Sequence, residues 1–232
     1  MEAIILAGGF GTRLQSVVPD LPKPMAAIQG RPFLAILLDA LITAGFTSAI
    51  LAVGYRYEAI RDYFGENYKS LSLAYSIETE PLGTGGAIAL ALKQVAESQC
   101  FVVNGDTYME LDYKAMLARH LEEKSVLTLA VLEVPDASRY GALDIEENRI
   151  LGFFEKGRSG PGIINGGTYL LSPDLFSHYN LPAAFSFETD LLMVHVHELR
   201  PLAFPTAGLL IDIGVPEDYH RAQNLFTSPE ST

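Results

Sequence analysis

Short runs of apolar and β-branched residues alternate with longer amphipathic segments through the first half of the chain. The short runs predict buried strands, and the segments with an apolar stripe predict helices. In chain order we expect a strand at 4–6, a helix at 33–44, a strand at 49–53, a helix at 58–64, a strand at 73–77, a helix at 84–95 and a strand at 101–103. This alternation is typical of repeated βαβ units, so we predict the α/β class with a doubly wound, mostly parallel sheet.

The pattern changes in the second half of the chain. We expect a helix at 113–123, then shorter strands at 126–134, 142–145, 150–154 and 163–171, and a final helix at 217–226. These strands predict a smaller mixed-sheet lobe laid over the first half. Because no long linker or repeat divides the chain, we expect one domain over 1–232, with halves at about 1–110 and 111–226 and a polar tail at 227–232.

A glycine-rich loop directly follows the first predicted strand. It comprises Leu6, Ala7, Gly8, Gly9, Gly11, Thr12 and Arg13. Glycines allow backbone N–H groups to approach an anion closely. Arg13 adds a planar guanidinium that suits phosphate oxygens, and Lys23, between Pro22 and Pro24, adds a point charge. A plain strand-to-loop turn would need neither cation, so these residues predict a polyphosphate site.

Two better-known glycine motifs do not fit this loop. A P-loop requires a Lys-Ser or Lys-Thr pair, and none follows Gly11. The dinucleotide fingerprint requires a small third residue where Leu14 stands, and an acidic residue about 20 positions further on, where the chain has Ile28-Gln-Gly-Arg-Pro32. The loop therefore argues against a P-loop NTPase and against a nicotinamide oxidoreductase.

Composition and charge narrow the possible partners. The chain has 232 residues, of which 49% are hydrophobic, enough for one globular core. Its formal net charge of −12 argues against binding nucleic acid or an anionic membrane. Cys100 is the only cysteine, so we expect a buried core thiol, no intramolecular disulfide and a cytoplasmic location. We expect neither a signal peptide nor a transmembrane helix.

Two aspartates follow apolar runs far apart in the sequence. Asp106 comes after 101–103, and Asp212 comes after Leu209-Leu-Ile211. Ligands of doubly wound sheets bind at the carboxyl ends of the strands, and two carboxylates that meet there can hold Mg²⁺. Either aspartate alone could instead cap the next turn. His195 and His197 lack convincing further ligands nearby, so we interpret them as surface residues.

Six further motifs follow the glycine loop and Pro22-Lys23-Pro24 in order along the chain. They are Glu80-Pro-Leu-Gly-Thr-Gly-Gly-Ala87, Asn104-Gly-Asp106, Arg139-Tyr-Gly141, Phe154-Glu-Lys156, Asn165-Gly-Gly-Thr-Tyr169 and Asp212-Ile-Gly-Val-Pro-Glu-Asp-Tyr219. Together they resemble the sugar-phosphate nucleotidyltransferases over nearly the whole chain. The resemblance implies a Rossmann-like, GT-A-like fold with a nucleotide-binding first half and a sugar-binding second half. It also implies attack of a sugar 1-phosphate on the α-phosphorus of a nucleoside triphosphate, which depends on alignment and charge stabilisation.

The resemblance also assigns roles to particular residues. Arg13 would bind the β- and γ-phosphates, Lys23 would bridge the α-phosphate and the incoming phosphate, and Asp106 and Asp212 would hold the Mg²⁺ cofactor. The residues that match sugar-phosphate contacts are Asn104, Gly141, Glu155, Lys156, Asn165 and Gly166. Glu155 and Lys156 are adjacent, so they share a site only if the strand ends or bulges there. The alternative is a solvated ion pair.

The base pocket is expected at the glycine-rich turn that opens the helix after residue 82. Its residues are Glu80, Pro81, Gly83, Thr84 and Gly85. The backbone of such a turn can lie along a purine edge, and Glu80 or a backbone carbonyl can accept the N–H groups of guanine. The spacing alone does not demand guanine. We choose it because Lys23-Pro-Met-Ala26 and Phe185-Ser-Phe-Glu188, with the motifs above, are similar to the short guanylyltransferases of D-glycero-alpha-D-manno-heptose 1-phosphate.

The expected substrates are therefore GTP and this heptose phosphate, for a bacterial surface glycan such as lipopolysaccharide, a capsule or an S-layer glycan. The expected assembly is a monomer or a small homo-oligomer. Mannose 1-phosphate with GTP, and N-acetylmuramate 1-phosphate with UTP, are alternatives within the family. A non-catalytic nucleotide-sensing subunit lies outside it, but such a protein could dispense with Lys23, Asp106 and Asp212.

Overall fold

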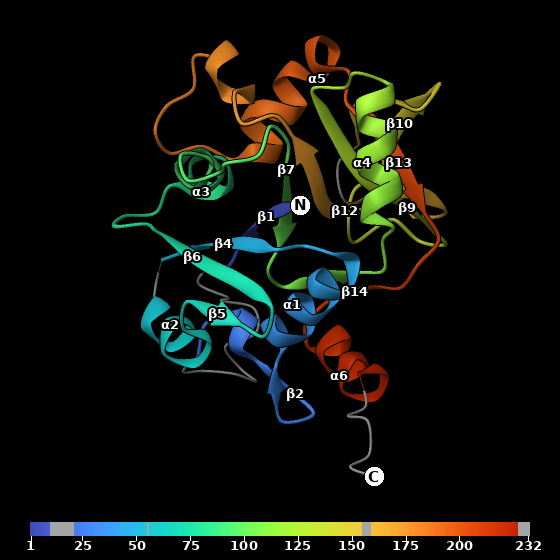
Figure 1. Cartoon of the computed structure of the whole chain (residues 1–232). Helices are drawn as coiled ribbons and strands as arrows, with labels where there is room; N and C mark the ends of the chain where they lie inside the picture. Colours follow the sequence, from blue (N-terminus) through green and yellow to red (C-terminus); the bar gives the residue numbers. More distant parts are fainter. Residues whose placement is uncertain (10–20, 55, 155–158, 227–232) are drawn as a thin grey trace.

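One sheet of ten strands runs through the computed structural model, which describes residues 1–9, 21–54, 56–154 and 159–226 (Figure 1). In spatial order the strands are β10 (Leu143–Glu146), β11 (Arg149–Phe153), β13 (Leu202–Thr206), β9 (Leu127–Val134), β12 (Gly162–Leu171), β7 (Cys100–Asn104), β1 (Glu2–Leu6), β4 (Ser48–Val53), β6 (Leu71–Ile77) and β5 (Asn67–Tyr68). Two short ribbons accompany the sheet, namely β2 (Ala27–Ile28) with β3 (Arg31–Pro32), and β8 (Thr107–Met109) with β14 (Leu210–Asp212).

The first half of the chain builds the parallel part of the sheet. Strands β7, β1, β4 and β6 all pair in parallel, and Ile4 of β1 lies between Val102 and Ile50. Strands β1, β4 and β7 are buried almost throughout because helices cover both of their faces, whereas β6, nearer the edge of the sheet, alternates between buried and exposed residues. The predicted α/β class and doubly wound parallel sheet are confirmed.

The second half of the chain continues this sheet. Strand β12 pairs antiparallel with both β7 and β9, and β13 then adds in parallel to β9. The mixed pairing was expected, but the strands extend the first sheet edge to edge instead of forming a lobe laid over it. The physical reason is that β7 offers an edge that needs a partner, and residues 168–171 of β12 pair with residues 100–103 of β7 along it.

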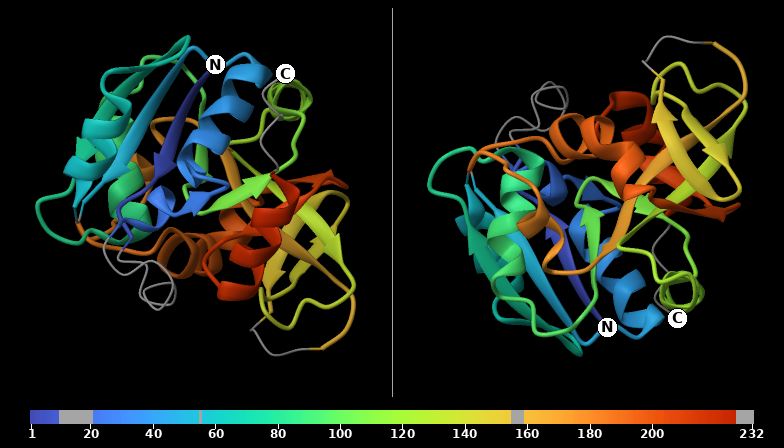
Figure 2. Two further views of the ribbon diagram at one scale, coloured as in Figure 1. Left: turned by 90° about the horizontal axis from the view of Figure 1, so that it is seen from below. Right: turned by 90° about the horizontal axis from the view of Figure 1, so that it is seen from above.

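Helices cover both faces of the sheet (Figure 2). One face packs against α1 (Phe33–Ala44), α2 (Tyr57–Phe64), α4 (Tyr113–Glu122) and α6 (Pro216–Leu225). The other packs against α3 (Gly83–Leu92), the π-helix η3 (Phe187–Leu192) and α5 (Met193–Leu199). Successive residues of β1 serve opposite layers, since Ile5 belongs to the first core and Ile4 to the second. Short 3₁₀ turns, η1 (Lys23–Met25) and η2 (Leu175–His178), complete the elements of the described residues.

The carboxyl ends of the central strands lie at one edge of the sheet. Backbone hydrogen bonds there connect the residues that directly follow these strands. The N–H of Ala7 donates to the carbonyl of Ala52 (2.8 Å), and that of Gly105 donates to the carbonyl of Leu6 (2.9 Å). Residues that follow β1, β4, β6 and β7 therefore meet at this edge. Within the described part of the chain, no helix is both long and apolar enough to span a bilayer.

Candidate active site

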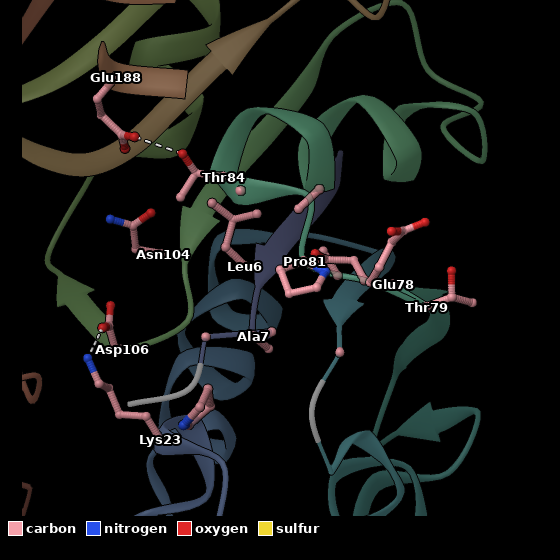
Figure 3. Close-up of a pocket in the computed structure, with 18 residues that line it drawn as sticks. Leu6, Ala7, Lys23, Glu78, Thr79, Pro81, Thr84, Asn104, Asp106 and Glu188 are labelled. Carbon is pink, nitrogen blue, oxygen red and sulfur yellow. Dashed lines mark hydrogen bonds and ion pairs between the residues drawn. The ribbon is translucent and has the colours of Figure 1, made fainter. Parts of the chain in front are cut away.

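A cleft of about 620 Å³ opens at the carboxyl ends of β1, β4, β6 and β7 (Figure 3). It is lined by Leu6, Ala7, Gly8, Gly9, Lys23, Pro24, Ala52, Gly54, Glu78, Thr79, Glu80, Pro81, Gly83, Thr84, Ala87, Asn104, Asp106 and Glu188. Lys23 and Asp106 lie at one end of the cleft, Glu78 and Pro81 at the other, and Leu6 and Ala7 between them (Figure 3). This is the position at which doubly wound sheets bind their ligands.

Lys23 forms an ion pair with Asp106 inside this cleft. Its Nζ lies 2.7 Å from Oδ2 of Asp106, and the two side chains are only 12% and 30% exposed. Lys23 begins η1, and the next two residues, Pro24 and Met25, are buried and fix the backbone. Asp106 comes two residues after the end of β7. The ion pair therefore joins two segments that the sheet brings together.

Asp212 lies beside this pair. It ends β14 and is paired with Thr107, while the N–H of Ile213 donates to the carbonyl of Asp106 (3.0 Å). Burial raises the pKa of Asp212 and the charge of Asp106 raises it further, whereas the N–H of Gly214 and the ammonium of Lys23 lower it. A Cβ placed on Gly214 would lie 2.7 Å from Oδ1 of Asp212 and 3.0 Å from Nζ of Lys23. Both carboxylates and the lysine thus share one region.

This donor set fits a hard divalent cation. Two neighbouring carboxylates repel each other, so a cation that binds both of them stabilises the pair. Carboxylate oxygens are also ligands that Mg²⁺ prefers. Among the described residues, no group of three or more histidine, cysteine, aspartate or glutamate side chains gathers around one point. An ion at Asp106 and Asp212 would therefore take its remaining ligands from substrate phosphates and water, as Mg²⁺ commonly does.

The glycine loop lines the cleft over its described part. Leu6, Ala7, Gly8 and Gly9 face it, and a Cβ on Gly8 would lie 2.8 Å from Oε1 of Glu78. The absence of a side chain at Gly8 thus allows the carboxylate of Glu78 to approach the loop closely. The predicted phosphate-binding residues Gly11, Thr12 and Arg13 lie outside the described residues.

The carboxylate at the end of the cleft opposite Lys23 is Glu78, which the sequence analysis missed. Oε2 of Glu78 accepts a hydrogen bond from the N–H of Leu82 (3.0 Å). Burial raises the pKa of Glu78, and the bond from Leu82 partly offsets this. Glu80, the predicted acceptor, is an exposed residue at the rim. Glu78 directly follows β6, so its place after a predicted strand was the available signal.

The glycine-rich turn before α3 has a packing role that differs from the expectation. Pro81, Gly83 and Thr84 line the cleft, but Gly85 does not. Its N–H donates to the carbonyl of Phe185 (2.9 Å), and a Cβ there would overlap the Phe185 ring. The prediction that Gly85 lies along the base is therefore wrong. This glycine allows the turn to pack against the segment before η3.

A chain of hydrogen bonds connects the cleft to Asn165 of β12. The Thr84 hydroxyl donates to Oε2 of Glu188 (2.9 Å), and the buried Tyr169 hydroxyl donates to Oε1 (3.1 Å). Asn165 Nδ2 in turn donates to the Tyr169 oxygen (2.8 Å). Glu188 belongs to a π-helix, an element that is frequent at functional sites. Sequence reasoning quoted Glu188 in a motif but assigned it no role.

The predicted sugar-phosphate residues lie at different places. Asn104 lines the cleft, and Asn165 reaches it only through Tyr169 and Glu188. Gly166 packs against Met109, and Gly141 ends a turn outside the cleft wall. Glu155 and Lys156 lie outside the described residues. Cys100 is fully buried, and burial raises the pKa of its thiol to about 12, as expected for a core cysteine.

The cleft lies at the carboxyl ends of parallel strands and has glycine backbone on one wall. A lysine lies there beside two carboxylates. Together these features are typical of proteins that bind phosphorylated ligands. The sequence matches the nucleotidyl transferase family over residues 2–228, and the chain belongs to that family.

Individual relatives are also similar over nearly the whole of this chain. The D-glycero-alpha-D-manno-heptose 1-phosphate guanylyltransferase of Aneurinibacillus thermoaerophilus is 44% identical over 223 residues, which cover 96% of this chain and 97% of that protein. The crystal structure of HddC from Yersinia pseudotuberculosis complexed with GMP-PN has a TM-score of 0.86 and 44% identity, covering 97% of this chain and 99% of that one. A mannose-1-phosphate guanyltransferase of Schizosaccharomyces pombe is 34% identical over 98% of this chain and 65% of its own length.

Proposed function

We propose that this protein transfers GMP from GTP to D-glycero-alpha-D-manno-heptose 1-phosphate, giving GDP-heptose and pyrophosphate. The observation that carries this proposal is the Lys23–Asp106 ion pair, which lies opposite Glu78 in one cleft and has Asp212 beside it. Relatives of that activity, 44% identical over nearly the whole chain, support the choice of base and sugar. The product would serve a bacterial surface glycan, and we propose the cytoplasm as the location of the protein because GTP is supplied there.

Glu78 replaces Glu80 as the proposed reader of guanine. A carboxylate accepts hydrogen bonds only, and guanine offers two adjacent donors, the ring N1–H and the 2-amino group. Uracil and thymine offer one N–H between two carbonyls, and a carboxylate would repel those oxygens. The N–H of Leu82 already holds Oε2 of Glu78, so the carboxylate is oriented before the base binds.

The reaction is a displacement at the α-phosphorus. An oxygen of the sugar phosphate forms the new P–O bond, and the bond from the α-phosphorus to the bridging oxygen breaks, so pyrophosphate leaves with the electron pair. Lys23 would bind the α-phosphate and the incoming phosphate, where negative charge grows. From its sequence motif, Arg13 would bind the leaving pyrophosphate. Mg²⁺, held by Asp106 and Asp212, would supply charge neutralisation to the triphosphate.

The acceptor would bind in the second half of the chain, beside the nucleotide-binding first half. Asn104 and Glu188 already line the cleft, and Glu188 touches both Thr84 of the nucleotide wall and Tyr169. The Gly141 backbone and the Asn165–Gly166 segment would complete the sugar pocket, with Glu155 and Lys156 assigned from sequence. Substrate specificity would then depend on how these residues read the sugar hydroxyls.

Pyrophosphate release tests the proposal. GTP, ATP, UTP and dTTP are each paired with the heptose phosphate, mannose 1-phosphate or N-acetylmuramate 1-phosphate, with and without Mg²⁺. We expect rapid release only from GTP with the heptose phosphate and Mg²⁺. Faster turnover of UTP or dTTP would reject the assignment of guanine, and faster turnover of another sugar phosphate would reject the heptose.

A further inference from the structure

Two sequence motifs with no shared role in the reaction meet through an ion pair. Arg139, in Arg139-Tyr-Gly141, donates from Nη2 to Oδ2 of Asp218 at 2.9 Å, and Asp218 belongs to the motif that begins at Asp212. The Asp218 side chain is only 10% exposed. The other cation near it, Arg221, is 3.9 Å away and 54% exposed. Arg139 is therefore the close partner of this buried carboxylate.

The residues after Arg139 form a tight turn, which we call the acceptor turn (residues 139–141). The N–H groups of Tyr140 and Gly141 both donate to the carbonyl of Ala137, at 3.0 and 3.2 Å. The guanidinium carbon of Arg139 lies 5.5 Å from the centre of the Tyr140 ring. Tyr140 is half-buried. The turn is thus joined to α6 through the hydrogen bond from Arg139 to Asp218.

The next residue continues into the acceptor half of the molecule. Ala142 pairs with Ile164 of β12, one residue before Asn165. A displacement of the acceptor turn would therefore move the backbone beside Asn165 as well.

Helix α6 is anchored on its other side to the hairpin that follows Lys23. The Tyr219 hydroxyl and Nε2 of Gln223 both donate to the carbonyl of Ala27, at 2.8 and 2.7 Å. Gln29 and Gln223 exchange two more hydrogen bonds, of 2.9 and 2.6 Å. Figure 1 shows α6 beside β2 and β14, the strands nearest to Lys23 and Asp212 in the chain.

We propose that α6 is a brace between the acceptor turn and Lys23, and that Arg139, through Asp218, is a positioning residue for the sugar phosphate. The proposal deepens the function proposed above and rests on it for the identity of the acceptor. Helix α6 contacts Arg139 of the acceptor turn on one side and Ala27, four residues after Lys23, on the other, so it would fix the distance between the bound acceptor phosphate and this lysine. A displaced acceptor turn would bind the sugar phosphate more weakly and leave the nucleotide site unchanged, so the loss should appear in the KM for the sugar phosphate and not in the KM for GTP.

The kinetic test compares Arg139→Gln with a matched surface control. Arg119 has the same 43% side-chain exposure as Arg139 and an ion pair of 2.7 Å with Glu123, and it lies on α4. We expect Arg139→Gln and Asp218→Asn each to raise the KM for the sugar phosphate at least tenfold while the KM for GTP stays within twofold. Arg119→Gln should change neither, and Arg139→Lys should restore part of the loss. Equal rises in both KM values, or no change in the acceptor KM, would overturn the proposal.

Hydrogen exchange tests the brace without reference to any substrate. The amides of Tyr140 and Gly141 should exchange faster in Arg139→Gln than in wild type, with no change in Arg119→Gln. Unchanged exchange would overturn the bracing role even if catalysis changed. If the wild type turns over a different nucleotide and sugar phosphate, the proposed function fails, and the KM comparison is made with that pair instead.

Discussion

Lys23 and Asp106 form a 2.7 Å ion pair although they are 83 residues apart, and Asp212 shares their region. Lys23 is fixed by the buried residues after it, and Asp106 by the end of β7. One cation thus lies among carboxylates that would otherwise repel each other. The same arrangement prepares the lysine and the carboxylates for a triphosphate and a divalent cation.

Asp106→Asn should weaken metal binding and turnover together, because it removes the charge of one of the two carboxylates proposed to bind Mg²⁺. We expect at least a tenfold loss of Mn²⁺ affinity, measured by electron paramagnetic resonance in the presence of GTP, and a larger loss of kcat. Asp144→Asn on β10 is the control and should change neither. A variant that retained wild-type Mn²⁺ affinity would remove Asp106 from the metal site.

Glu78→Gln should reduce discrimination between GTP and ITP, which lacks the 2-amino group. The amide oxygen of the new glutamine still accepts one hydrogen bond from guanine. The charge-assisted bond is lost, however, and the amide N–H₂ faces the second N–H donor of the base. We expect the ratio of kcat/KM for GTP over ITP to fall about tenfold, which corresponds to about 1.4 kcal/mol. The Glu80→Gln control should keep the wild-type ratio. If only Glu80→Gln altered the ratio, the original assignment would be restored.

Gly85→Ala should destabilise the fold by about 1–3 kcal/mol, because the new methyl group overlaps the Phe185 ring. Urea denaturation measures this change. Gly9→Ala, where no atom of the described residues lies within 4 Å of an added Cβ, should be nearly neutral for stability. Phe185→Leu combined with Gly85→Ala should recover part of the loss. Equal stability of the two glycine variants would contradict the packing role.

The stability of the fold should decrease as the pH falls from about 6.5 to about 4, in part because of His120. Burial lowers the pKa of His120 to about 4, and its ring nitrogens lie 2.7 Å from the Thr128 hydroxyl and 2.9 Å from Oε1 of Gln99. In this window the unfolded chain binds a proton that the native state does not, so unfolding is favoured by up to about 1.4 kcal/mol per pH unit. Urea denaturation at a series of pH values gives the free energy of unfolding as a function of pH. This free energy should depend less steeply on pH in His120→Gln than in wild type, whereas the His197→Gln control should keep the wild-type dependence. Identical slopes in all three would contradict the role of His120.

The local sequence predicted the strongly periodic elements well. Helix α1 has the expected bounds because Pro32 precedes it and Gly45 ends it with a φ of 94°. Strand β13 was not predicted, since it contains Pro205. This proline is tolerated because β13 pairs with β11 only at Leu202 among the described residues.

The site was predictable where a motif fixed the residue, as for Lys23 between two prolines, or where the residue follows an apolar run, as for Asp106 and Asp212. It was not predictable where long-range packing decided. Glu78 and Glu80 are the same residue type two positions apart, and the sequence alone does not distinguish them. In the fold, Glu78 is half-buried and Glu80 is exposed. Gly85 resembled a ligand-binding glycine, but its neighbour is Phe185, 100 residues later. Such contacts depend on how α3 meets η3, which no local spacing encodes.

The central claim is that Lys23 and the two carboxylates promote attack of a sugar phosphate on the α-phosphorus of GTP. The most direct measurement follows oxygen-18 from labelled heptose 1-phosphate, by mass spectrometry of the products, in wild type, Lys23→Ala and a surface control, Lys93→Ala. We predict that all the label appears in GDP-heptose and none in pyrophosphate. Lys23→Ala should keep its fold, checked by circular dichroism and thermal unfolding, but form the product about 100- to 1,000-fold more slowly, and Lys93→Ala should match wild type. Label in pyrophosphate, no product from the wild type, or near-normal turnover by Lys23→Ala would contradict the account.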